Sequence, residues 1–119
     1  MPEIYNPEPT HGWCYYFEQA DLAGQMGDWE RVVELGDEAF SLADYPNDPV
    51  ERFVFIEGYA HLGNWNRTEG LAIQSYKVSP NYIGPLLCKL LNRIDNELPA
   101  DNIKESSLND MNTKFSCLP

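Results

Sequence analysis

The sequence has few basic residues. It contains 8 Lys and Arg against 19 Asp and Glu, which gives a formal net charge of -11. A protein of this charge repels the phosphates of DNA and RNA instead of releasing their counterions, so nucleic acid is not an expected partner. The charge is concentrated in residues 1–48, where 11 acidic residues and one Arg leave a net -10. This acidic half serves solubility or steers a basic partner.

The sequence also lacks any long apolar run. No stretch approaches the roughly 18 consecutive apolar residues of a membrane-spanning helix, so we expect this segment to be soluble, without direct membrane insertion. The start, MPEIYNPEPT, has neither the charged head nor the apolar core of a signal peptide. We expect residues 1–11 to be a Pro-rich linker or the start of an expressed fragment.

Cysteine and histidine are scarce. The three cysteines, Cys14, Cys88 and Cys117, form an odd set without a CxxC pair, so we expect reduced thiols and neither a disulfide framework nor a zinc site. We identify no second ligand at helical metal spacing for either histidine, His11 or His61. The prediction is that the domain has no metal site and no cofactor.

Motifs for catalysis are also missing. The glycines of GYAHLGNWNRTEG follow a predicted helix instead of a strand, so they do not form a phosphate-binding loop. Cys14 lies three residues after His11, but a linker residue is held too poorly to act as its base, and we interpret Cys14 as a small packing residue. We therefore predict that the domain is not an enzyme.

Helical periodicity is what the sequence does contain. Apolar residues recur at steps of three and four from Trp13 to Met26 and again from Trp29 to Leu42, as in amphipathic helices. Gly27 suits the left-handed end of the first helix, and the next residue, Asp28, suits the N-cap of the second. A turn this short predicts an antiparallel helix hairpin over residues 12–45.

The same organisation recurs over residues 48–80. Asp48 and Pro49 are suited to begin a helix, and Gly63 with Asn64 repeats the elbow of Gly27 with Asp28. A shift of 36 residues aligns the two hairpins, and a period of this length is typical of helical solenoids. The aligned pairs are Phe17 and Phe53, Gly27 and Gly63, Trp29 and Trp65, Arg31 and Arg67, Leu35 and Leu71, and Phe40 and Tyr76. We interpret Gly27, Trp29, Gly63 and Trp65 as the structural elbows.

A fifth helix is predicted over residues 82–97, with leucines on a broad apolar face. It would cap the stack formed by the two hairpins. The polar tail, residues 98–119, is expected to be mostly irregular, with at most a short helical turn held by Ile103, Leu108 or Phe115. The predicted fold is all-α. Residues 12–97 would form a helical-repeat domain, an α-α superhelix of two antiparallel hairpins followed by a C-terminal capping helix.

The two hairpins resemble tetratricopeptide repeats. The residues that carry the resemblance are Ala20, Gly27, Asp28, Trp29 and Ala39 in the first copy and Tyr59, Gly63, Trp65, Ala72 and Pro80 in the second. Two positions depart from the alanine that is usual in that family, Val32 and Thr68. A third, Ala23, stands where the family usually has tyrosine. The resemblance implies a stack of helix hairpins that binds a peptide or protein segment in a concave groove.

Two segments are also similar to the soluble C-terminal tail of bacterial multi-spanning membrane proteins of the glycosyltransferase type. They are WCYYFEQADLAGQMGDWERVVELGDEAF and YPNDPVERFVFIEGYAHLGNW. This similarity implies a domain tethered to a bacterial membrane as part of a longer chain. Any catalytic part would then lie elsewhere on that chain.

Equivalent positions on the first helix of each hairpin would form rungs along the groove. The rungs are Phe17 with Phe53, Asp21 with Glu57, and Gln25 with His61. Their apolar and acidic side chains would suit a peptide that carries Lys or Arg. Two alternatives remain: Phe17 and Phe53 can belong to the core, and Glu57 can pair internally with Arg93.

The predicted function is that of a non-catalytic protein interaction module. The partner would be a protein or peptide, with basic segments favoured by the charge. The alternative is a structural or self-association role, with a homodimer formed through the second hairpin and the leucines of the fifth helix.

Overall fold

The computed structural model describes residues 12–42 and 48–117; the predicted linker, residues 1–11, lies outside them. The all-α class is confirmed, because these residues contain helices and no strand. No helix among them is long and apolar enough to cross a membrane. The helices are α1 (Trp13–Gln25), α2 (Trp29–Ala39), the short 3-10 helix η1 (Pro49–Arg52), α3 (Phe53–His61), α4 (Trp65–Val78), α5 (Pro80–Glu97) and α6 (Asn102–Lys114).

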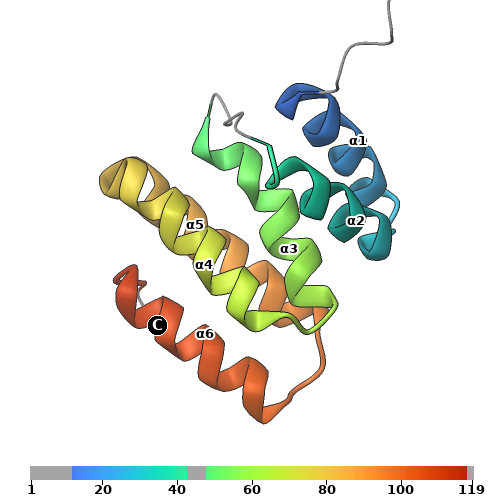
Figure 1. Ribbon diagram of the computed structural model, residues 1–119. Coiled ribbons are helices and arrows are strands. Elements are labelled where there is room, and N and C mark those ends of the chain that lie inside the picture. The colour runs from blue at the N-terminus through green and yellow to red at the C-terminus, as the bar shows by residue number, and fades with distance from the viewer. Residues whose placement is uncertain (1–11, 43–47, 118–119) are drawn as a thin grey trace, which may run out of the picture.

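Tight elbows join α1 to α2 and α3 to α4 at the predicted positions (Figure 1). Gly27 and Gly63 have positive φ angles of 73° and 79°, a left-handed conformation that glycine adopts without strain. The Asp28 N–H then donates to the Ala23 carbonyl at 2.9 Å, and Asn64 repeats this bond 36 residues later. The Asp28 and Asn64 side chains each accept the backbone N–H three residues on, so each caps the following helix.

The first hairpin packs on the second through aromatic rings. Trp13, Phe40 and Phe55 form a triangle with ring centroids 5.3 to 5.4 Å apart, within the range of favourable aromatic pairs. The backbones of α2 and α3 also approach closely, because a Cβ added to Gly58 would lie 2.5 Å from Cγ1 of Val32. This interface holds α1 and α2 against the rest of the molecule.

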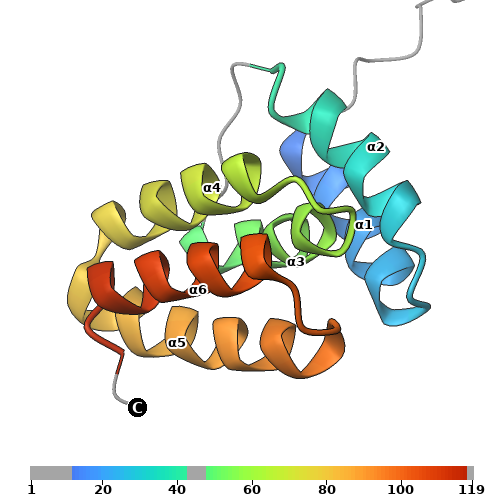
Figure 2. The same cartoon turned by 90° about the horizontal axis from the view of Figure 1, so that it is seen from below.

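The prediction that residues 98–119 are mostly irregular is wrong. Residues 102–114 form α6, which pairs with α5 as a third hairpin, so α5 is not the terminal helix (Figures 1 and 2). Leu108, Met111 and Phe115 are buried, whereas Ile103, one of the residues expected to hold the tail, is 66% exposed.

The return helices α2, α4 and α6 bury equivalent positions. A shift of 36 residues relates the buried residues of α2 to those of α4, and a second shift relates them to those of α6. The three sets are Val32, Leu35, Gly36 and Ala39; Thr68, Leu71, Ala72 and Ser75; and Lys104, Ser107, Leu108 and Met111. Two of the four positions are polar in α4 as well as in α6, but only α6 has a charged residue, Lys104, at one of them, which obscured its apolar period.

The two buried polar residues of α6, Lys104 and Ser107, have hydrogen-bond partners. The buried Lys104 ammonium donates to the Asp95 and Leu98 carbonyls at 3.0 and 2.8 Å and pairs with the Asp95 carboxylate at 2.9 Å. The hydrogen bond with Asp95 is the main cause that raises the pKa of Lys104. The Ser107 hydroxyl donates to Glu69 of α4 at 2.7 Å. Burial of these groups is tolerated because each is hydrogen-bonded.

Two predictions about cysteine are also wrong. Cys88 of α5 and Cys117, just after α6, form a disulfide, although we expected reduced thiols. The partners are 29 residues apart, and their proximity follows only once α5 and α6 are known to form a hairpin. Cys14 is exposed and free, so it is not the packing residue that we expected; its position on α1 faces away from the core.

Candidate functional site

A hollow of about 280 Å³ lies between α1, α3 and α5. Its floor is tight, because a Cβ added to Gly24 would lie 2.9 Å from Cγ2 of Val54. Most of the other lining groups are charged or polar. The lining residues are Asp21, Gly24 and Gln25 of α1, Trp29 at the start of α2, Val54 and Glu57 of α3, and Arg93 and Glu97 of α5.

Glu57 is the buried acid of this hollow. Its side chain is only 7% exposed, and Arg93 donates to both of its oxygens, from Nε at 3.1 Å and from Nη2 at 3.0 Å. The internal pair that we considered as an alternative is therefore present. Removal of Arg93 would therefore leave the buried charge of Glu57 without a compensating partner.

His61 is held from two sides. Its Nε2 lies 2.7 Å from Oε1 of Glu97, and its ring stacks on Trp29 with centroids 4.4 Å apart and an interplanar angle of 17°. Trp29 therefore forms part of the elbow and also fixes a titratable side chain beside the hollow. Stacking of this kind restricts the rotamer of the imidazole.

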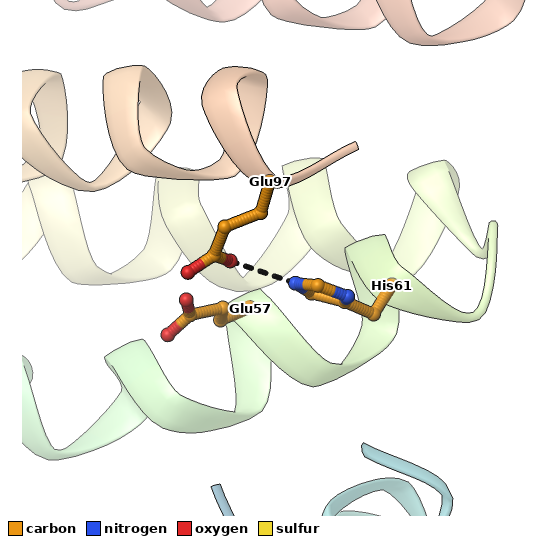
Figure 3. A group of neighbouring side chains, drawn as sticks. All are labelled: Glu57, His61 and Glu97. Atoms are coloured by element: carbon orange, nitrogen blue, oxygen red, sulfur yellow. Dashed lines mark hydrogen bonds and ion pairs between the residues drawn. The ribbon is translucent and has the colours of Figure 1, made fainter. Parts of the chain in front are cut away.

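The carboxyl groups of Glu57 and Glu97 face each other (Figure 3). Burial is the largest cause that raises the pKa of Glu57, with a further rise from Glu97 against the lowering effect of Arg93. Burial also acts to raise the pKa of Glu97, but hydrogen bonds from Glu57 and His61 outweigh it and the pKa is lowered. Two acids this close are stable when a proton or another cation lies between them.

The predicted rung residues separate into two groups. Asp21, Gln25 and Glu57 line the hollow, and Gln25 also donates to Asp21 at 3.2 Å. His61 does not line the hollow itself but contacts its lining residues Trp29 and Glu97. Phe17 and Phe53 are half-buried and pack against the hydrophobic core, as the alternative interpretation has it. The acidic and apolar rungs therefore do not form one continuous strip.

Two functional candidates were missed in the sequence: Trp29 was interpreted only as an elbow, and Glu97 was not considered. Arg93 was identified as an internal partner of Glu57, from which it is separated by 36 residues. The same 36-residue shift would also have found Glu97, which lies 36 residues after His61.

A set of metal-ligating side chains is present in the same place. The ligand atoms of Glu57, His61 and Glu97 all lie within 4.8 Å of one another. Our statement that His61 has no second ligand at helical spacing is wrong, because Glu57 precedes it by four residues on the same helix, the separation at which side chains share a face.

A larger hollow, of about 650 Å³, separates α5 from α6. Its lining includes Asn92, Asn109 and Asn112 together with the Cys88–Cys117 disulfide. It does not contain any of the six predicted rung residues. The α1, α3 and α5 hollow is therefore the stronger candidate site.

Comparison with protein-family models, with curated proteins and with solved structures finds no match.

Proposed function

We propose that this domain is a non-catalytic interaction module that binds a basic peptide segment in the hollow between α1, α3 and α5. The observation that carries the proposal is the composition of the lining. The lining contains three carboxylates, from Asp21, Glu57 and Glu97, and one arginine, Arg93, so negative charge is in excess. A Lys or Arg side chain of a partner is the group that such a lining favours.

The wall of the hollow adds a second element of recognition. Trp29 is partly buried and lines the hollow next to the acidic groups. One face of the ring stacks on His61. An aromatic ring beside carboxylates suits a guanidinium or ammonium group, because the ring attracts the cation and the carboxylates pair with it. Asp21 and Glu97 are exposed and are available to an incoming chain.

The wider organisation is part of the proposal. Equivalent buried positions recur at 36-residue intervals in α2, α4 and α6, which supports a tetratricopeptide-like superhelix of three hairpins whose first helices line the concave side. The similarity to tails of bacterial membrane glycosyltransferases supports attachment to a longer membrane-bound chain. In that setting the domain would recruit a partner to the membrane.

The test is a titration followed by NMR. Isotope-labelled protein is titrated with short peptides that carry Lys or Arg at varied spacing, and with matched peptides in which Gln replaces the basic residues. We expect the basic peptides to shift the amide signals of Gly24, Gln25 and Val54 and the indole signal of Trp29. The affinity should fall with added salt, since exposed charge pairs are screened.

A charge-matched pair of variants makes the test specific. Asp21→Lys reverses a charge in the hollow, while Asp110→Lys makes the same change on α6, where Asp110 is exposed. Binding should be lost in Asp21→Lys and kept in Asp110→Lys. Equal loss in both variants, or shifts spread evenly over the acidic surface of α1 and α2, would show non-specific attraction and contradict the proposal.

Self-association is the second candidate function. The leucines of α5 do not offer the expected interface, because Leu87, Leu90 and Leu91 are buried within the molecule. Exposed apolar side chains occur elsewhere: Met26 and Leu62, at equivalent helix ends, are 77% and 47% exposed. Sedimentation velocity over a range of concentrations tests this role, and a sample that stays monomeric rules it out.

A further inference from the structure

We propose that Glu57, His61 and Glu97 form a binding site for a divalent transition metal, with Zn²⁺ as the best fit. One imidazole nitrogen and two carboxylate oxygens converge from α3 and α5, with ligand atoms within 4.8 Å of one another. Zinc bonds to these donors are about 2.0–2.2 Å long, so the donors around one ion lie about 3–4 Å apart. A small rotation of Glu97, whose side chain is 33% exposed, closes the remaining gap.

The orientation of the donors supports the site. Glu57 and Glu97 turn their carboxyl groups toward each other, and the Nε2 edge of His61 points to the same space (Figure 3). Facing carboxylates repel unless a positive charge lies between them. A divalent ion at this point would compensate both carboxylates and take the place of the His61 to Glu97 hydrogen bond.

Neighbouring residues hold two of the three donors. Trp29 stacks on the His61 ring, and Arg93 donates to both oxygens of Glu57. Each carboxylate oxygen has about two acceptor positions, so the arginine leaves Glu57 able to bind an ion. Outer partners of this kind orient metal ligands in established sites. Arg93 therefore acts as a positioning residue for Glu57.

The surroundings give access and select the type of ion. The hollow of about 280 Å³ borders Glu57 and Glu97, so a hydrated ion can reach the donors, and water can complete its coordination. The exposed Asp21 carboxylate lines the same hollow and adds to the attraction. An imidazole with two carboxylates favours zinc and related metals over Mg²⁺ and Ca²⁺, which prefer oxygen ligands alone.

The test is calorimetric titration of the metal-free 119-residue chain with Zn²⁺. We expect one ion per chain. Glu97→Gln and His61→Gln should each weaken binding by at least about 10–100-fold, the loss that follows even when an outer partner of a metal ligand is removed. Circular dichroism confirms that both variants stay helical, and Co²⁺ absorption in the visible range gives an independent reading of ligand geometry.

Two controls separate this site from other sources of zinc binding. Asp110→Asn removes an exposed charge on α6, outside the hollow, and no ligand, and the double variant His11→Gln with Cys14→Ser removes the other histidine and the free thiol. Both should bind Zn²⁺ within a fewfold of the unmodified chain. The proposal is overturned if Zn²⁺ does not bind, if Glu97→Gln and His61→Gln bind as well as the unmodified chain, or if a control loses as much affinity as they do.

The metal proposal does not depend on peptide binding. The peptide titration is run with EDTA and again with one equivalent of Zn²⁺. Loss of zinc binding with intact peptide binding contradicts only the metal site, and the converse result contradicts only the interaction module.

Discussion

The second and third hairpins bury equivalent positions with different chemistry. In α4 the buried residues include Thr68 and Leu71, and 36 residues later α6 buries Lys104 and Ser107. At the shared position of Leu71 and Ser107 the second hairpin therefore relies on apolar contact and the third on a hydrogen bond, whereas at the shared position of Ser75 and Met111 the polar and apolar side chains are exchanged. The difference teaches that the fold fixes which positions are buried, while local partners decide which side chains can occupy them.

The largest effect is expected where the core is apolar. Leu71→Ala should lower the free energy of unfolding by about 2–5 kcal/mol, because it removes a side chain that is 1% exposed and leaves a cavity. Urea unfolding followed by circular dichroism measures the change. A loss below about 1 kcal/mol would mean that the second hairpin does not depend on apolar packing at this position.

The disulfide should contribute next. Cys117→Ser opens a link between residues 29 apart in sequence, and a closed loop of that length stabilises a fold by about 3.6 kcal/mol in the chain-entropy model. Urea unfolding measures the loss in free energy of unfolding for this variant. The control is Cys14→Ser, which replaces an exposed free thiol. If both variants match the unmodified protein, packing alone holds the third hairpin.

A smaller loss is expected at the contact between the first and second hairpins. Gly58→Ala places a methyl group 2.5 Å from Cγ1 of Val32, and overpacking of this kind costs about 1–3 kcal/mol. The matched control is Gly70→Ala in α4, where a Cβ would meet no atom within 4 Å and helix propensity favours alanine. Thermal unfolding should show a lower Tm for the first and an unchanged or higher Tm for the second.

The smallest effect is expected at the polar position of α6. Ser107→Ala removes the hydrogen bond to Glu69 and should cost about 1 kcal/mol, although Ser107 is equivalent to Leu71. The paired measurement with Leu71→Ala, in the same urea assay, sharpens the comparison between the hairpins. Equal losses at the two positions would remove the distinction drawn between them.

The sequence was sufficient for the parts of the fold that depend on local signals. Gly27 and Gly63 were recognised as elbows because a glycine followed by a capping residue has a local mechanism. The third elbow has no such glycine: Pro99 occupies the position equivalent to Gly27 and Gly63, and the capping side chain of α6 belongs to Asp101. With a charged residue at one of its buried positions as well, α6 gave neither of the usual signals.

The site was predictable only in part, for a related reason. Asp21, Gln25 and Glu57 followed from the 36-residue shift between two recognised hairpins, whereas Glu97 required a third copy. The contact between Trp29 and His61 could not be inferred, because it depends on how one hairpin is placed on the next. The disulfide was hidden for the same reason, since it depends on the pairing of α5 with α6.

The position of the disulfide also determines how the molecule would carry mechanical load. Cys117 lies beyond the last residue of α6, and its partner Cys88 lies within α5. A pulling force applied to the chain after Cys117 would pass through the sulfur bridge directly to α5. The segment between the two cysteines, including all of α6, would carry little tension, so α6 would stay folded under a load that strips an unlinked terminal helix from its neighbours.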